Sequence, residues 1–508
     1  MTNGTAPAIG EPIAPRAAQA ELFGQPIGLW TLFMTEMWER FSYYGMRALL
    51  VLFLVDSVAH GGFGVSDKTA TAVYALYTAS AYLFNLPGGW IADRLIGAQQ
   101  AVLIGGIIIA LGHITLGVAP DARAFYLGLM VIVLGTALLK PNISAIVAGL
   151  YPEGGTRSDA GFTIFYMGIN VGATLGPLVT AWLAQTYGWH WGFGAAAVGM
   201  IFGVFQFLLT RHRLGGAGLK PHTADGGAVP ARTLRRWLIV GGVLLAVLFS
   251  LTWTGQLNVN PIGAQVVATW VIVAMSIGYF FYLFVFAGLK PLELKKVCLL
   301  LVLFLGCALF WSGFEQAGSS FNLFADRYTN RMIGSFQIPA GWFQFVNPGF
   351  ILIFAPVFSA LWVRLGRRNL DPSSPVKFAL GLVGMAVGFV IMAMAARYVA
   401  AGQKVGISWL TLTYLFHTFG ELCLSPVGLS AVSQLVPTRF VGQSLGVWFL
   451  GTALGNLIAG RIAGDFDANN VAAMPGQYLN IFWFGIVCAV LLLFAGLAIH
   501  RWIQRSSP

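Results

Sequence analysis

Long apolar stretches recur along the whole chain and constrain its fold more than any other feature. A helix needs roughly 20 apolar residues to cross the hydrocarbon core of a bilayer. About fourteen stretches reach that length, at residues 27–55, 69–95, 100–118, 124–150, 160–186, 191–210, 235–253, 265–287, 296–324, 341–363, 377–397, 407–435, 440–463 and 478–502. Several exceed the minimum, so tilted or kinked helices are expected. The pattern predicts an all-α, polytopic membrane protein with 14 transmembrane helices.

The composition excludes a water-soluble protein. Of the 508 residues, 57% are hydrophobic and 9% are charged, whereas a soluble domain averages about 25% charged residues. The net charge of +11 does not point to nucleic acid, because the Lys and Arg residues punctuate the apolar stretches rather than form one tract. The cysteines show no metal-ligand spacing and are expected to be small core residues. They are Cys298, Cys307, Cys423 and Cys488.

Basic residues in the loops predict the orientation of the helices. They cluster after the sixth, eighth and tenth stretches and at the end of the chain, and these loops fall on one side because successive helices alternate in direction. The positive-inside rule makes that side cytoplasmic, with both termini on it. The basic residues are Arg211, Arg213, Lys220, Arg232, Arg235, Arg236, Lys290, Lys295, Lys296, Arg364, Arg367, Arg368, Lys377, Arg501 and Arg505.

The distribution of glycine, proline and charge divides the chain into segments. Residues 1–25 lack the basic start and apolar centre of a secretory signal, and a disordered cytoplasmic tail is expected there. Residues 26–211 and 291–503 are expected to form two six-helix bundles. Between them, a basic cytoplasmic linker at 212–234 and an inserted helical hairpin at 235–290 are expected. Two six-helix halves are typical of major facilitator transporters, which bind their substrate between the halves at mid-membrane.

A short loop supports that class. Residues 88–97, Gly-Gly-Trp-Ile-Ala-Asp-Arg-Leu-Ile-Gly, lie between the second and third stretches. They resemble the G-x-x-x-D-R-x-x-G loop of the major facilitator superfamily. The alternative interpretation is a simple polar turn.

Ionisable residues inside the apolar stretches are few, and each costs at least about 2.5–3.5 kcal/mol to insert. The first stretch carries the densest group of ionisable residues. They recur at helical intervals, so they lie along one face of the helix. Glu36, Arg40, Tyr43 and Arg47 share that face, and Glu39 and Tyr44 flank it. The carboxylates can exchange protons, and the guanidiniums influence which form is favoured. The alternative is a static ion-pair network that holds helices together.

Three further stretches carry single ionisable groups. Lys140 lies beside Pro141 and needs an anion, either Glu36, Glu39 or a substrate carboxylate, unless it snorkels from a helix end. In the second half, Trp311, Glu315, Gly318 and Asn322 are expected to share one helical stripe. Glu315 could pair with Arg47 across the cavity, so that protonation would couple to rocking of the halves.

Glu421 lies one turn from His417 and is a natural partner for a substrate ammonium. His417 could titrate, although a packing histidine is the simpler interpretation. Asn170, Asn347, Tyr82 and Trp448 could contact substrate, or they could serve as interhelical hydrogen bonds and packing. Basic groups in the first half thus face acidic groups in the second, and a zwitterion fits between them. Asparagine amides can bond a peptide backbone through both C=O and N–H.

At these residues the chain resembles the proton-coupled oligopeptide transporter family (POT, also PTR) of the major facilitator superfamily, bacterial branch. The resemblance covers about residues 27–500, and the E-x-x-E-R-F-x-Y-Y-G element is complete at 36–45. The loop at 88–97, the run that ends at Asn170, and the F-E-Q-A-G-S-S and G-E-L-C-L-S-P runs from Phe314 and Gly420 agree with it.

The resemblance implies symport of di- and tripeptides with protons, by alternating access, in the inner membrane of a bacterium. The proton is the coupling ion, and no cofactor is expected. Proton coupling would involve Glu36, Glu39, Arg40 and Glu315, with Glu315 pairing with Arg47 in a gate. Arg47 and Lys140 would bind the peptide carboxylate, and Asn170, Asn347 and Glu421 its amino end. Tyr43, Tyr44, Tyr82, Trp311 and Trp448 would line the pocket, and Ser425 also belongs to the implied peptide site.

Other functions stay open or are excluded by the residues present. Residues 69–95 contain no histidine, unlike some relatives, so proton binding must depend on the carboxylates. A same-fold carrier of another small zwitterion, organic anion or drug is the alternative. The complete E-x-x-E-R element argues against nitrate. An enzyme is not expected, since the sequence has no H-E-x-x-H motif, no P-loop and no G-x-S-x-G in a strand–turn–helix context. Nothing suggests a receptor or channel, and a monomer is expected because one chain holds both halves of a cavity.

Overall fold

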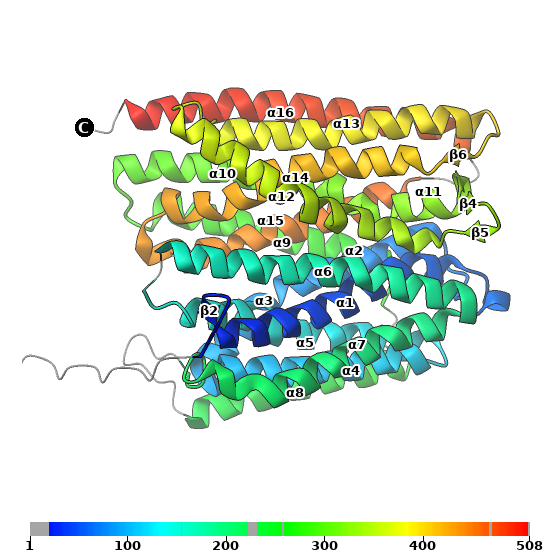
Figure 1. Ribbon diagram of the computed structural model, residues 1–508, viewed down its shortest axis with the longest axis horizontal. Coiled ribbons are helices and arrows are strands. Elements are labelled where there is room, and N and C mark those ends of the chain that lie inside the picture. Colours follow the sequence, from blue (N-terminus) through cyan, green and yellow to red (C-terminus); the bar gives the residue numbers. More distant parts are fainter. Residues whose placement is uncertain (1–19, 154, 222–230, 257–258, 467–469, 506–508) are drawn as a thin grey trace, which may run out of the picture.

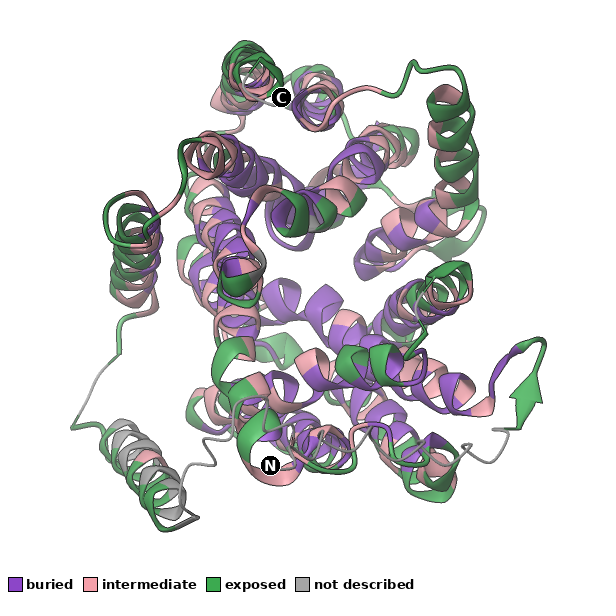
Figure 2. Cartoon of the chain, turned by 90° about the vertical axis from the view of Figure 1, so that its left-hand side faces the viewer, coloured by how far each residue is buried: buried purple, intermediate pink, exposed green. Residues whose placement is uncertain are grey.

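The computed structural model describes residues 20–153, 155–221, 231–256, 259–466 and 470–505. The described chain is a bundle of long helices that run along one common direction (Figure 1). Both ends of the described chain lie at the same end of the bundle, which we call the terminal end; the opposite end is the distal end (Figure 1). Seen from the terminal end, buried residues fill the middle of the bundle and exposed residues lie on its outer faces (Figure 2).

The first half contains seven helices of the described chain. They are α1 (Ile27–Val55), α2 (Asp67–Leu83), α3 (Asn85–Ile91), α4 (Ala98–Val118), α5 (Ala122–Gly149), α6 (Gly155–Tyr187) and α7 (Trp189–Thr210), with 3₁₀ turns at Val58–His60 and Arg211–Leu214 and a π-helical turn at Ala92–Ile96. The apolar stretch at 69–95 is therefore interrupted at Phe84 rather than continuous. Pro87 explains the break, because it has no N–H to donate to the carbonyl one turn earlier.

The second half also contains seven described helices. They are α10 (Pro291–Phe314), α11 (Ser320–Tyr328), α12 (Val346–Arg367), α13 (Ser374–Ala400), α14 (Ser408–Leu435), α15 (Val441–Gly464) and α16 (Met474–Gln504), with 3₁₀ turns at Glu315–Gly318, Ala340–Phe345, Thr438–Phe440 and Val471–Ala473. Two-residue strands pair at the distal end: β3 (Thr329–Asn330) with β6 (Val405–Gly406) in parallel, and β4 (Met332–Ile333) with β5 (Phe336–Gln337) antiparallel.

The two helices between the halves do not form the hairpin that was expected at 235–290. Figures 1 and 2 show α8 (Ala231–Trp253) and α9 (Pro261–Val285) well apart, with α8 beside α5 and α9 packed on α2 and α15. Polar contacts hold α9 on α15: Gln265 Nε2 donates to the Leu457 carbonyl at 2.7 Å, and the Tyr279 and Ser444 hydroxyls are 2.7 Å apart. Residues 222–230 of the expected linker lie outside the described residues.

Part of the expected disordered tail is folded. Residues 1–19 lie outside the described residues, but β1 (Glu21–Leu22) and β2 (Gln25–Pro26) form a small antiparallel hairpin. It is held by Tyr151, whose hydroxyl donates to Gln25 Oε1 at 2.6 Å, and by Arg157, whose Nη2 lies 2.6 Å from Glu21 Oε1. Contacts with residues outside the tail therefore stabilise a hairpin in a segment whose own sequence does not strongly favour any secondary structure.

Eleven helices of the described chain are long and apolar enough to cross a membrane. The helix α1 is not among them, although it lies in the middle of the bundle (Figure 1). Its charged residues Glu36, Glu39, Arg40 and Arg47 are buried, at most 6% exposed. A helix in the middle of a membrane protein that carries four buried charges must have partners for them inside the protein.

Polar contacts join the two halves at the distal end. Both Nη atoms of Arg327 in α11 contact Asp67 at the start of α2, at 2.6 and 2.7 Å. Asn322 Nδ2 donates to the Ala48 carbonyl at 2.9 Å, and Trp342 Nε1 donates to the Leu178 carbonyl at 2.9 Å. The halves are thus closed against each other at this end.

Candidate functional site

A cavity lies between the two halves and encloses about 1060 Å³ of empty space, including the part that opens to solvent. Helices α1, α2, α5 and α6 line it from the first half, and α10, α12 and α14 line it from the second. Most of the candidate residues from the sequence are brought together here. They are Glu36, Arg40, Tyr44, Arg47, Tyr82, Lys140, Asn170, Trp311, Glu315, Asn347, Glu421 and Ser425.

The acidic cluster of α1 places one guanidinium between two carboxylates. Arg40 Nε lies 3.0 Å from Glu36 Oε1 and also contacts the Glu39 carboxylate. All three residues are at most 3% exposed, and Glu36 Oε2 and Arg40 Nη2 have no hydrogen-bond partner within the described part of the chain. Two ionised carboxylates and one guanidinium carry a net charge of −1. Binding one proton neutralises the cluster, which a low-dielectric site favours.

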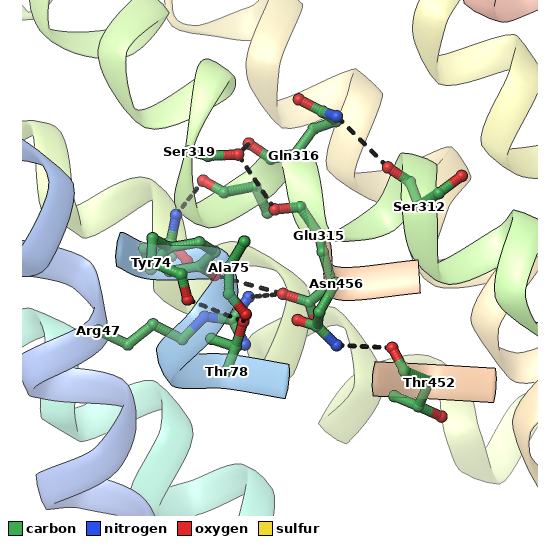
Figure 3. A network of polar contacts seen from close by, with 12 residues as sticks. Arg47, Tyr74, Ala75, Thr78, Ser312, Glu315, Gln316, Ser319, Thr452 and Asn456 are labelled. Atoms are coloured by element: carbon green, nitrogen blue, oxygen red, sulfur yellow. Dashed lines mark hydrogen bonds and ion pairs between the residues drawn. The ribbon is translucent and has the colours of Figure 1, made fainter. Parts of the chain in front are cut away.

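A second ion pair joins the halves across the cavity (Figure 3). Arg47 Nη2 of α1 lies 2.5 Å from Glu315 Oε2, and the Tyr74 hydroxyl donates to the same oxygen at 3.3 Å. The Arg47 guanidinium also lies 5.5 Å from the Tyr44 ring and 5.4 Å from the Tyr74 ring. Both ends of the pair are buried, so separating it without neutralising one member would leave an uncompensated charge.

The stripe expected along residues 311–322 is wrong beyond Glu315. The helix α10 ends at Phe314, one 3₁₀ turn covers Glu315–Gly318, and α11 begins at Ser320. Because the helix is interrupted, Asn322 is not on the cavity face and donates to the Ala48 carbonyl instead. Glycines at 313 and 318 weaken the helix on both sides of the turn.

Gly318 has a specific packing role, which predicts the effect of enlarging it. A Cβ at this position would clash with the phenol of Tyr74, the side chain that donates to Glu315. We expect Gly318→Ala to lower the free energy of unfolding by about 1–3 kcal/mol, the usual cost of overpacking. Thermal unfolding in detergent measures this, with Gly194→Ala as the control because no atom lies within 4 Å of a Cβ added there. Equal stability of the two variants would contradict the packing role.

Lys140 lies on α5 immediately before Pro141, and its ammonium faces an aromatic ring rather than a carboxylate. Its Nζ is 4.0 Å from the centroid of the Tyr82 ring. Neither Glu36 nor Glu39, the partners considered from the sequence, forms an ion pair with it, and no other described residue does. A cation at a cavity wall without a protein counter-ion is suited to a ligand carboxylate.

The opposite wall of the cavity is built from hydrogen-bond acceptors and amides. Asn347 at the start of α12 donates from Nδ2 to Glu421 Oε2 of α14 at 3.0 Å. Asn170 lies on α6 of the first half, and its Nδ2 donates to the Tyr166 carbonyl one turn earlier at 2.9 Å. His417 is fully buried, with Nε2 3.1 Å from the Met385 carbonyl and its ring packed against Phe314, Phe321 and Phe389. The packing interpretation of this histidine therefore agrees with the structure.

Three candidate residues do not line the cavity. Glu39 is buried behind Arg40, and Tyr43 is buried with its ring stacked 5.9 Å from the Tyr77 ring. Trp448 was expected in the pocket, but its ring packs 6.0 Å from the Phe378 ring within the second half. The ring also lies against Gly428, where an added Cβ would meet it.

Some cavity residues were missed from the sequence. Tyr166, Gln344 and Tyr414 line the cavity, and Tyr74 contacts Glu315. Helical spacing could have found two of them. Tyr166 lies one turn before Asn170, and Tyr414 lies two turns before Glu421, so each shares a face with a candidate residue.

Comparisons with known proteins agree on one kind of protein. The model of the POT family (PTR2) matches residues 99–479. The peptide transporter YePEPT of Yersinia enterocolitica is 39% identical and aligns over 95% of this chain and 96% of its own. A di-/tripeptide transporter of Lactococcus lactis subsp. cremoris is 36% identical, over 88% and 90% of the two chains.

Solved structures are similar over the same extent. A peptide transporter POT in complex with sulfate matches with a TM-score of 0.87 and 38% identity, covering 96% of this chain and 97% of that one. A POT family transporter in complex with 5-aminolevulinic acid matches with a TM-score of 0.85 and 32% identity, covering 95% and 98%. The arrangement of helices around the cavity is therefore shared with these structures.

Proposed function

Because this chain belongs to the POT family, we propose that it is a secondary active symporter that imports di- and tripeptides together with protons. The observation that carries the proposal is the polarity of the cavity. Lys140, Arg40 and Arg47 line it from the first half, where they outnumber the acidic Glu36, and Glu315 and Glu421 line it from the second. A zwitterion of peptide length can pair with the basic groups of one wall and the acidic groups of the other, whereas an anion or a cation can pair with only one of them.

In this proposal the peptide carboxylate binds Lys140 and the ammonium binds Glu421. The Tyr82 ring lies over the Lys140 ammonium. It shields the cation from water but leaves it able to donate hydrogen bonds to a carboxylate. Asn347 and Asn170 line the cavity and present amide groups to the amino end and the peptide bond. The aromatic residues Tyr44 and Trp311 line the same cavity and tolerate varied side chains.

Coupling to protons follows from the two ion-pair groups. A proton that enters the Glu36–Glu39–Arg40 cluster neutralises its net charge, and a proton on Glu315 removes the charge that holds Arg47. Loss of the Arg47–Glu315 pair frees the halves to separate at the distal end, which is the step that exposes the cavity to the other side. Peptide and proton would thus be carried together because neither alone leaves every buried charge paired.

The proposal extends to the placement of the chain. The protein is a multi-pass membrane protein, and its relatives are bacterial. We place it in the inner membrane with both termini in the cytoplasm, because the basic loops lie at the terminal end. The moving units would be the bundles of residues 26–211 and 291–503, with one chain sufficient for transport.

Uptake of labelled dialanine into proteoliposomes tests the proposal. Purified protein, an inwardly directed proton gradient and a parallel sample with a protonophore are required. We expect accumulation that collapses when the protonophore is added. Accumulation of 5-aminolevulinic acid but not of dialanine would favour the alternative, a carrier of another small zwitterion, since a related structure binds that compound.

A further inference from the structure

Thr418 lies on α14 one turn before Glu421 and is fully buried. Its hydroxyl donates to the Tyr414 carbonyl one turn earlier, at 2.7 Å. A hydroxyl has one proton, so this bond leaves the Thr418 oxygen as an acceptor only. Asn347 Nδ2, on α12, lies 2.9 Å from that oxygen.

The Asn347 amide nitrogen therefore has two acceptors. Thr418 Oγ1 lies at 2.9 Å and Glu421 Oε2 at 3.0 Å, and an amide nitrogen carries two hydrogens to donate. The reversed amide would set its carbonyl oxygen against the Glu421 carboxylate and against a hydroxyl that has no proton to offer. Two neighbours thus determine the same orientation. The Asn347 carbonyl oxygen makes no hydrogen bond within the described part of the chain, and the side chain lines the cavity.

From this geometry we infer that Thr418 is a positioning residue for substrate recognition. It fixes the Asn347 amide so that the carbonyl oxygen, and not the NH₂ group, is presented to the amino end of the substrate. The amino-end site then consists of acceptors, the Asn347 carbonyl oxygen and the Glu421 carboxylate. Such a site selects a ligand end that donates several hydrogen bonds, as an ammonium does. The identity of that ligand depends on the proposed function.

Binding to Thr418→Val and Thr418→Ser tests this role. Dialanine and its analogue without the amino group, N-propionylalanine, are the probes. We expect Thr418→Val to weaken dialanine binding about 10- to 100-fold, as expected for losing one hydrogen bond to a charged group, and the analogue less than about 2-fold. Thr418→Ser keeps the hydroxyl and should restore dialanine binding. Equal weakening of both probes, or no rescue by serine, would show that Thr418 only supports the fold.

A double-mutant cycle with Asn347→Ala shows whether Thr418 acts through that amide. Thr418→Val should not weaken dialanine binding further once Asn347 is replaced. The same cycle on the melting temperature of the ligand-free protein should be non-additive, because the two side chains share a hydrogen bond. Additive melting temperatures would overturn the inference. This readout needs no ligand, so it stays decisive if the wild type fails to bind dialanine, which would count against the proposed function alone.

Discussion

Replacing Glu36 or Glu39 with glutamine should abolish proton-driven accumulation of dialanine while counterflow exchange across the same membrane continues. Both carboxylates contact Arg40, and the three groups together lack one positive charge for neutrality. Glutamine has the shape of a protonated carboxyl, so each variant holds the cluster permanently in the neutral state that a proton would produce. The halves can then move with peptide alone, and a proton gradient no longer drives net transport.

The measurement compares two assays on the same proteoliposomes. Accumulation under an imposed proton gradient should fall more than about tenfold, which corresponds to about 1.4 kcal/mol, and exchange of labelled for unlabelled dialanine should change less than about threefold. Glu153→Gln is a matched control, because Glu153 is an exposed carboxylate in the loop between α5 and α6. Loss of both assays in a variant that elutes as folded protein would count against proton coupling by this cluster.

Replacing Lys140 with alanine should weaken the binding of peptides with a free carboxylate far more than the binding of amidated ones. The Lys140 ammonium has no carboxylate partner within the described part of the chain and lies 4.0 Å from the Tyr82 ring. A hydrogen bond to a charged group contributes about 1.5–3 kcal/mol, and about 1.4 kcal/mol corresponds to tenfold in affinity. We therefore expect about 10- to 100-fold weaker binding of dialanine.

The C-terminally amidated peptide is the internal comparison for this variant. Its neutral amide gains little from an ammonium, so its affinity should change less than about threefold, well under one hydrogen bond to a charged group. Lys404→Ala serves as the protein control, because Lys404 is exposed in the loop before β6. If Lys140→Ala weakens both peptides equally, Lys140 is not part of the carboxylate site and instead supports the cavity wall.

The polarity of the cavity could be predicted from the sequence because it depends on a few charged residues, each with a high free energy of insertion into the membrane. Glu36, Arg40, Lys140 and Glu421 stand in long apolar stretches, where an unpartnered charge is expensive. Such residues must face a cavity or each other, whatever the exact packing. The pairing of Arg47 with Glu315 was foreseen on the same ground, and the two groups lie 2.5 Å apart.

Side-chain directions that depend on packing could not be predicted in this way. Trp448 and Trp311 both lie in long apolar helices, yet only Trp311 lines the cavity. The Trp448 ring instead lies against Gly428 of α14 and Phe378 of α13, contacts that the composition of its own helix does not contain. Thr418 carries no charge at all, and its importance appears only when Asn347 of another helix is seen beside it.

By itself, then, the sequence determined that the chain spans a membrane with many helices and that a few ionisable residues lie within its apolar stretches. These properties follow from transfer free energies of individual residues, which are local. Only the tertiary structure decided that α9 packs on α15 instead of pairing with α8, that residues 21–26 form a hairpin, and that α10 ends before Glu315. The packing of α9 and the hairpin at 21–26 depend on contacts between residues distant in sequence, whose energies a one-dimensional pattern does not contain.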